Sequence, residues 1–82
     1  MRQVDKMLKI MLENKEKEIW LAKDFQRGQW FIGYEATARM SDLARMYPEL
    51  FIIGKEGRFR TLSIIWKKKR MIKKLMKELN ED

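Results

Sequence analysis

The sequence predicts a small α+β domain that is mostly helical, and three observations support this fold class. Apolar residues recur at helical spacing in three separate segments, near the start, the middle and the end of the chain. Between the second and third of these segments lie two β-prone runs joined by a glycine-bracketed loop, which is typical of a β-hairpin. With 82 residues, the chain has room for one domain with a modest core.

The first third of the chain predicts a helix, a short strand and a second, short helix. The helix is expected from about Arg2 to Asn14, where five apolar residues form one stripe: Val4, Met7, Leu8, Met11 and Leu12. Ile19–Leu21 is too short for a helix and is predicted to be a short strand or an extended entry to the next element. Ala22–Arg27 is predicted to be a short helix with Phe25 as its inward anchor, and it ends at Gly28.

The middle of the chain predicts a longer helix followed by the hairpin. The helix is expected from about Tyr34 to Tyr47, with a core stripe made of Ala36, Met40, Leu43, Ala44 and Tyr47. Pro48 ends this helix because proline cannot continue it. Leu50–Ile53 and Arg58–Trp66 are the predicted strands, and the four residues 54–57 between them are the predicted turn.

The end of the chain predicts a basic amphipathic helix over about Lys67–Asn80. Its apolar face is made of Met71, Ile72, Leu75, Met76 and Leu79. This face is too hydrophobic to stay exposed, so it either folds back on the first helix or pairs with a second copy. We expect a homodimer through the first and last helices, with residues 1–66 forming the main domain. Residues 67–82 then pack on that domain or in the dimer interface.

The charge of the chain is basic and uneven. The net charge is +7, and the chain carries nine basic and eight acidic residues up to Gly54 but ten basic and four acidic residues after it. A field concentrated in this way attracts polyanions, either nucleic acid or an anionic membrane surface.

Several function classes are disfavoured by the composition. The chain has no Cys and no His, so the usual zinc sites and nucleophile–base pairs are excluded, and no phosphate-binding glycine loop is present. We therefore expect no enzyme, no cofactor and no small-molecule substrate. No apolar run approaches the roughly 18 residues of a membrane span, and Met1–Lys6 is unlike a signal peptide. A cytoplasmic, nucleoid-associated protein is expected, with membrane-surface binding by the last helix as an alternative.

The order of elements resembles a known family. The segment Glu35-Ala36-Thr37-Ala38-Arg39-Met40-Ser41-Asp42-Leu43 is followed by Tyr47-Pro48 and then by Gly57-Arg58-Phe59-Arg60-Thr61. Over Ile19–Trp66 this is similar to the small winged helix-turn-helix proteins of phage, plasmid and archaeal origin. The resemblance implies a winged helix-turn-helix with a two-stranded wing, to which the C-terminal helix is an addition. It also implies DNA binding as the commonest use, although winged helices also serve as protein-interaction modules.

The resemblance places candidate DNA contacts on four surfaces. The helix predicted at residues 34–47 would read the major groove with its outer face, which carries Tyr34, Thr37, Ala38, Ser41 and Arg45. Phosphate or minor-groove contacts would come from three further surfaces. These are the short helix with Lys23 and Arg27, the wing tip with Lys55 and Arg58, and the cation run made of Lys67, Lys68, Lys69 and Arg70. For each surface the alternative is an ordinary solvated, charged face.

Arg39, Asp42 and Arg60 are expected to be structural rather than functional. Arg39 and Asp42 are three residues apart on one helix and can form an ion pair. Asp42 is also a possible acceptor for Arg58 or Arg60 of the hairpin. The expected function is sequence-specific binding of double-stranded DNA, as a transcriptional regulator. The alternatives are a protein-interaction module and an accessory DNA-binding factor in replication or recombination.

Overall fold

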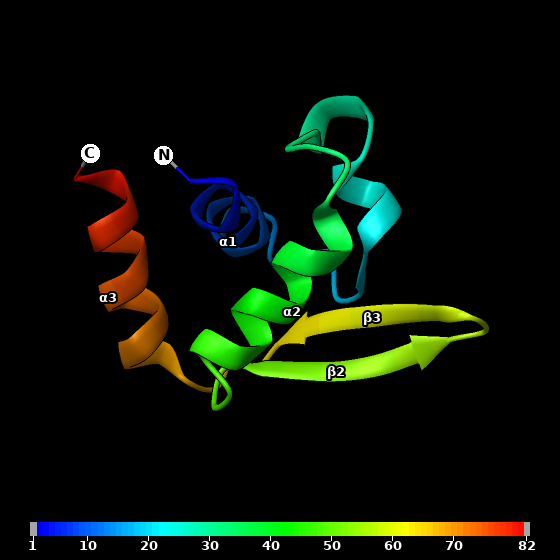
Figure 1. Ribbon diagram of the computed structural model, residues 1–82. Helices are drawn as coiled ribbons and strands as arrows, with labels where there is room; N and C mark the ends of the chain where they lie inside the picture. The colour runs from blue at the N-terminus through cyan, green and yellow to red at the C-terminus, as the bar shows by residue number, and fades with distance from the viewer. Residues whose placement is uncertain (1, 82) are drawn as a thin grey trace.

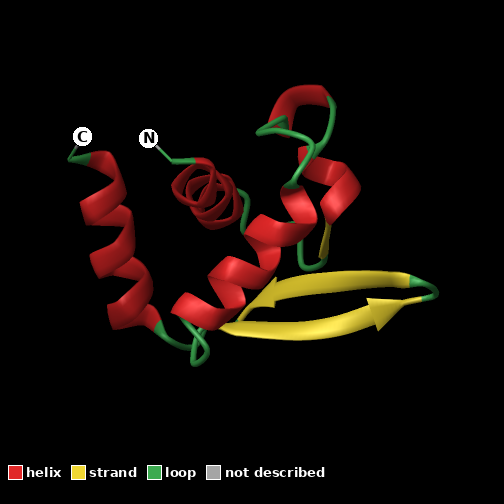
Figure 2. Cartoon of the chain, in the orientation of Figure 1, coloured by secondary structure: helices red, strands yellow, loops and turns green. Residues whose placement is uncertain are grey.

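The computed structural model describes residues 2–81, within which the chain forms three α-helices, two short 3-10 helices and a three-stranded antiparallel sheet (Figures 1 and 2). The elements follow one another as α1 (Gln3–Glu13), β1 (Trp20–Leu21), η1 (Ala22–Phe25), η2 (Gly28–Trp30), α2 (Ala36–Met46), β2 (Phe51–Glu56), β3 (Phe59–Ile64) and α3 (Lys69–Asn80). The predicted α+β class is confirmed.

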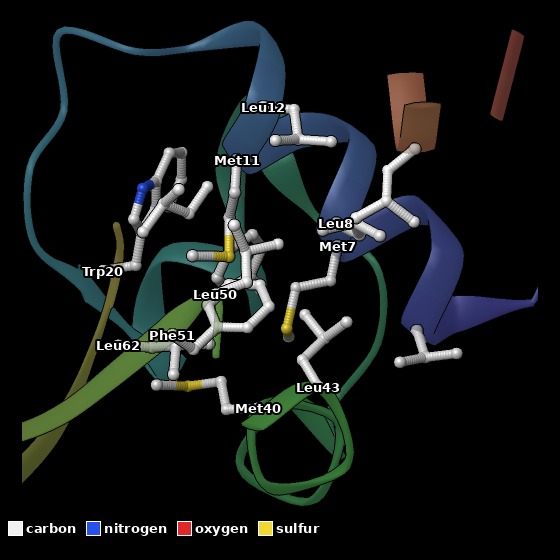
Figure 3. Close-up of a cluster of buried hydrophobic side chains, with 14 of the residues drawn as sticks. Met7, Leu8, Met11, Leu12, Trp20, Met40, Leu43, Leu50, Phe51 and Leu62 are labelled. Atoms are coloured by element: carbon white, nitrogen blue, oxygen red, sulfur yellow. The ribbon is translucent and has the colours of Figure 1, made fainter. Parts of the chain in front are cut away.

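The core lies where α1 packs between α2 and α3 and where the sheet closes against α2 (Figure 1). All five apolar residues of the predicted α1 stripe are buried, as are Ala36, Met40 and Leu43 of α2. Figure 3 shows the side chains of α1 gathered in one cluster with Met40, Leu43 and residues of the strands. Helical periodicity therefore identified the buried faces of both helices correctly.

The helix ends differ slightly from the prediction. The side-chain amide of Asn14 donates to the carbonyl oxygen of Ile10 at 2.7 Å, so α1 ends at Glu13. The helix α2 begins at Ala36 rather than at Tyr34, because residues 34 and 35 form a turn. It ends at Met46, two residues before the proline, as expected for an X-Pro boundary.

The sheet has the order β1-β3-β2, with β3 in the centre. The predicted hairpin pairs Phe51–Glu56 with Phe59–Ile64, and the short β1 pairs Trp20 with Leu62 and Leu21 with Thr61. The sequence predicted the strand at residues 19–21 but not its partner. Because β1 adds to β3, the buried ring of Trp20 lies in the core beside Phe25, and the centroids of the two rings are 5.1 Å apart.

The hairpin turn is tighter than predicted. Gly54, Lys55 and Glu56 lie within β2, and the connection is the two-residue loop Gly57–Arg58. Gly57 has φ +62°, which a type II′ turn requires at its first central position. Gly54 instead permits a close cross-strand approach, because a Cβ there would lie 2.9 Å from the Thr61 hydroxyl. The predicted turn over residues 54–57 was wrong because only one of its two glycines makes the turn.

The short helix predicted over Ala22–Arg27 is present, as a 3-10 helix that is shorter than predicted. The 3-10 helix η1 ends at Phe25, and η2 follows after two residues. The carboxylate of Asp24 accepts from the backbone N–H of Leu21 at 2.8 Å, and Ile32 N–H donates to the carbonyl of Phe25 at 2.9 Å. These bonds tighten the segment into turns rather than extending it as an α-helix. Phe25 is fully buried, as predicted.

The last helix folds back on the first. α3 begins at Lys69 rather than Lys67 and buries Ile72, Leu75 and Leu79 on the side of α1. Met71 and Met76 of the same predicted face are half-buried against the core. The two apolar stripes thus cover each other within one chain, which was one of the two arrangements expected, and the homodimer stays a prediction. None of the helices in residues 2–81 is long and apolar enough to cross a membrane.

Candidate nucleic-acid interface

An open groove of about 450 Å³ lies between η1, the start of α2 and the tip half of the β2–β3 hairpin. The hairpin extends beyond the helices, so its tip stands free of the core (Figure 1). We call this feature the hairpin groove, and it is lined by Leu21, Ala22, Lys23, Gln26, Thr37, Met40, Lys55, Arg58, Phe59 and Arg60. Three segments that are distant in sequence therefore build one concave surface.

The hairpin groove is strongly basic. Within residues 2–81, the charged side chains that line it are Lys23, Lys55, Arg58 and Arg60, and no acidic side chain is among them. Lys55 and Arg60 are direct cross-strand partners. Like charges directly opposite each other destabilise a sheet, and neither residue forms an ion pair within the described chain. An anion bound between them would relieve this repulsion.

A hydrogen bond joins the hairpin to α2. Arg60 Nη1 donates to the Ser41 hydroxyl at 3.1 Å. The predicted acceptor, Asp42, is occupied elsewhere, because its carboxylate lies 2.9 Å from Arg39 Nε. The Arg39–Asp42 ion pair is thus confirmed, and it neutralises the acidic residue of α2. Within residues 2–81 neither of the two possible hairpin partners of Asp42, Arg58 or Arg60, forms an ion pair with it, and Arg60 bonds Ser41 instead.

The residues of α2 that were predicted to contact the DNA major groove lie in two different places relative to the hairpin groove. Thr37 lines the hairpin groove, and Ser41 lies half-buried where it accepts from Arg60. Ala38 and Arg45 are exposed outside the groove lining. The spacing of Ala38, Ser41 and Arg45 at i, i+3 and i+7 places them along one strip of the helix surface.

Tyr34 precedes α2 instead of belonging to it. Its side chain is 82% exposed and meets Phe31 edge-on, with ring centroids 5.5 Å apart. The side-chain amide of Gln26 donates to the Tyr34 carbonyl at 3.2 Å, which ties the loop to the end of η1. The exposed aromatic pair is therefore held beside α2, outside the hairpin groove.

The two cations predicted on the short helix occupy different surroundings. Lys23 extends toward the hairpin, and its Nζ lies 5.7 Å from the centre of the Phe59 ring. Arg27 is exposed after the end of η1, beside an open depression that Lys23 and Asp24 also line. Only Lys23 of this pair belongs to the hairpin groove.

The cation run lies at the opposite end of β3. Lys67, Lys68, Lys69 and Arg70 are all exposed around the start of α3, whereas Lys55 and Arg58 belong to the tip of the hairpin. The start of α3 and the hairpin tip lie at opposite ends of the molecule (Figure 1). The first turn of α3 carries no acidic residue. Cations at a helix N-terminus oppose the helix dipole, so this placement is unfavourable for the isolated helix. The run and the hairpin groove are two separate basic surfaces.

Sequence reasoning missed six of the ten residues that line the groove, and three of them bear on its chemistry. Gln26 was not considered, Phe59 was treated as part of a β-prone run, and Arg60 was assigned a structural role. The spacing around Gly57 could have revealed the Lys55–Arg60 pair, because a two-residue loop at 57–58 makes residues 55 and 60 opposite neighbours. The contact between Lys23 and Phe59 could not be predicted in this way, because the two residues are far apart in the sequence.

The described residues 2–81 contain no group of three or more acidic, Cys or His side chains that could hold a metal ion. In comparisons with models of known protein families, with curated proteins and with solved structures, the chain matches none of them.

Proposed function

We propose that this chain is a winged helix-turn-helix domain that binds double-stranded DNA, with α2 as the recognition helix and the β2–β3 hairpin as the wing. The observation that carries the proposal is the hairpin groove, where four cations from η1 and the hairpin meet the N-terminal part of α2. Phosphate binding by converging cations supplies most of the affinity of DNA-binding proteins.

The topology supports this proposal. A helix, a short strand, a turn-forming segment, a second helix and a hairpin follow one another, and the short strand pairs with the second hairpin strand. In a winged helix this arrangement presents one helix and the hairpin on the same side of the domain. The departure from the pattern is the segment before α2, where two 3-10 helices replace an α-helix.

The dimensions and charges also suit a duplex. The longest extent of the molecule is 33 Å, close to the roughly 34 Å of one turn of B-DNA. A duplex is long enough to contact the hairpin groove and the cation run together, whereas a small anion is not. In this arrangement Ala38 and Arg45 face base edges, and Lys23, Lys55, Arg58 and Arg60 hold phosphates.

The test is the salt dependence of duplex binding. Fluorescence anisotropy with a labelled random-sequence duplex, at several salt concentrations, should give an affinity that falls steeply as salt rises. Arg58→Gln should reduce the slope of log affinity against log salt by about 0.9. The matched control is Lys6→Gln, which removes an exposed cation of α1 outside the groove lining. A wild-type protein without salt-dependent duplex binding at low ionic strength contradicts the proposal.

A protein-interaction module is the second candidate function. It is favoured by the exposed aromatic pair Phe31–Tyr34, because exposed aromatic side chains are enriched at protein interfaces. The experiment above separates the two candidates, since an interaction module has no reason to bind duplex DNA with a steep salt slope. Whether DNA binding serves transcription, replication or recombination depends on the target site, which selection from a random duplex pool would identify.

The predicted homodimer belongs to the same proposal. A two-fold dimer would suit a palindromic operator, with half-sites one helical turn apart. Because α1 and α3 cover each other within the chain, their remaining exposed surface would have to form the interface. The chain mass in solution, measured by sedimentation or light scattering, decides between a monomer of 10.0 kDa and a dimer.

A further inference from the structure

Phe59 is an exposed aromatic residue in the basic hairpin groove. Its side chain is 59% exposed, directly after the turn of the hairpin. It is flanked in sequence by Arg58 and Arg60, and the Lys23 ammonium lies 5.7 Å from its ring centre. Each of these cations also lines the hairpin groove.

The fold has little need of an aromatic ring at this position. Phe59 pairs across the hairpin with Glu56, and both side chains are exposed. The hydrophobic core that includes Leu62 and Ile64 of the same strand does not include Phe59. A ring that is more than half exposed contributes little to burial, so its apolar surface is available to a partner.

We propose that Phe59 makes the apolar contact of the hairpin with DNA, packing against the sugar and base surface of a groove while its neighbouring cations hold the flanking phosphates. This inference rests on the proposed function and adds a chemical role to it. The partner must be anionic, because the charges beside the ring are basic apart from Glu56 across the strand. A duplex offers phosphates and flat apolar surfaces a few ångströms apart, which matches a ring placed among cations.

The role differs from that of the cations in one measurable way. A phenyl ring neutralises no phosphate and releases no counterion, so it contributes to affinity without contributing to the salt slope. Aromatic and apolar side chains that contact bases act through packing and stacking instead. A variant that lacks only the ring should therefore have a lower affinity for DNA but the same dependence of affinity on salt.

The experiment compares Phe59→Ala with wild type on a labelled random-sequence duplex over a range of salt concentrations. We expect the variant to bind about tenfold more weakly at every salt concentration, with an unchanged slope. Phe59→Leu should recover part of the loss, because leucine retains apolar volume. Phe31→Ala is the matched control, since Phe31 is also an exposed phenylalanine, at 50%, but does not line the hairpin groove.

The outcomes distinguish this inference from the proposed function. If wild type binds duplex DNA and Phe59→Ala binds equally well, the role of Phe59 is refuted and the proposed function stands. If Phe31→Ala loses as much affinity, the effect is not specific to the hairpin, and the inference also fails. If wild type does not bind the duplex, both proposals fail.

Co-sedimentation with anionic phosphatidylserine vesicles is run in parallel, and a loss confined to vesicle binding assigns the ring to a membrane surface instead. A thermal melt of each variant shows that the fold is retained.

Discussion

Two basic surfaces of this molecule differ in how they are assembled. The cation run Lys67–Arg70 is contiguous in sequence and exposed around the start of α3. The hairpin groove gathers its cations from η1 and from both strands of the hairpin, beside α2. The run is conspicuous in the sequence and borders open depressions beside α3, whereas the groove is not apparent in the sequence and is walled by η1, α2 and the hairpin.

This difference suggests a division of work between the two surfaces. A contiguous run on an exposed helix attracts any polyanion and fixes no orientation. Cations held on rigid strands beside a helix place phosphates at defined positions, and so they orient the helix relative to the bases. If the chain binds DNA as proposed, the groove should govern register and sequence preference, and the run should supply affinity of little specificity.

The largest expected effect comes from neutralising each surface in turn. The triple variant Lys55→Gln, Arg58→Gln, Arg60→Gln should lower the salt slope by roughly 2.7 and abolish sequence preference, because orientation is lost with the phosphates. Lys67→Gln, Lys68→Gln, Lys69→Gln should weaken specific and non-specific binding alike and leave the preference intact. Anisotropy with a selected and a scrambled duplex measures both. Equal loss of preference in the two variants would erase the distinction between the surfaces.

The next effect concerns α2 itself. Arg45→Ala should weaken binding to the preferred duplex by about tenfold and change binding to scrambled DNA much less, because a base-edge contact adds discrimination. The same titration on both duplexes checks this. Uniform weakening on the two sequences would reassign Arg45 to a phosphate contact.

A smaller effect is expected at the Lys55–Arg60 pair, where one substitution should raise the stability of the fold and lower its affinity for DNA. Lys55→Glu replaces a like-charge cross-strand pair by an opposite-charge pair and should raise the free energy of unfolding by roughly 0.5–1 kcal/mol. The same change should reduce duplex affinity, because an acidic side chain then faces the phosphates. Urea denaturation and anisotropy measure the two quantities. A variant that is less stable than wild type would mean that the repulsion between Lys55 and Arg60 is already screened.

The smallest effect is a pH dependence at a residue that lines neither the hairpin groove nor the depression beside the cation run. Burial raises the pKa of the Tyr47 phenol, and the negative charges of Asp5 and Glu78 raise it further. The folded state therefore holds this proton more tightly than the unfolded chain. Its stabilising contribution is complete below the unfolded pKa of about 10 and is lost as the pH rises through the folded value. Tyr47→Phe should flatten the fall in unfolding free energy at alkaline pH, and an unchanged pH profile would exclude Tyr47 as its source.

Much of the fold followed from local patterns, and the misses have identifiable causes. The buried faces of α1 and α2, and Ile72, Leu75 and Leu79 of α3, were predicted because apolar periodicity is a property of the segment itself. The short helix predicted over Ala22–Arg27 ends early, at Phe25, because bonds to Leu21 and Ile32, which lie outside the segment, tighten it into turns. The turn was misplaced because two glycines near each other have different uses, one in the loop and one against Thr61.

The candidate site was predicted less completely than the fold. The sequence singled out Lys23, Thr37, Lys55 and Arg58, which the structure brings to one groove. It separated Arg60 from them, and it grouped Ala38, Arg45 and the cation run with them although these lie outside the groove lining. Charge and exposure can be inferred for each residue alone, whereas convergence depends on strand register and on how η1 folds.

The sequence by itself determined the number and place of the long helices, the existence of the hairpin and the excess of positive charge, because each depends on residues close together in the chain. Tertiary structure decided that β1 adds to β3, that α3 covers α1 and that Arg60 bonds Ser41 rather than Asp42. Those outcomes depend on which surfaces bury one another most completely, and that choice is made by the whole chain at once. The basic groove beside α2 is a consequence of that packing.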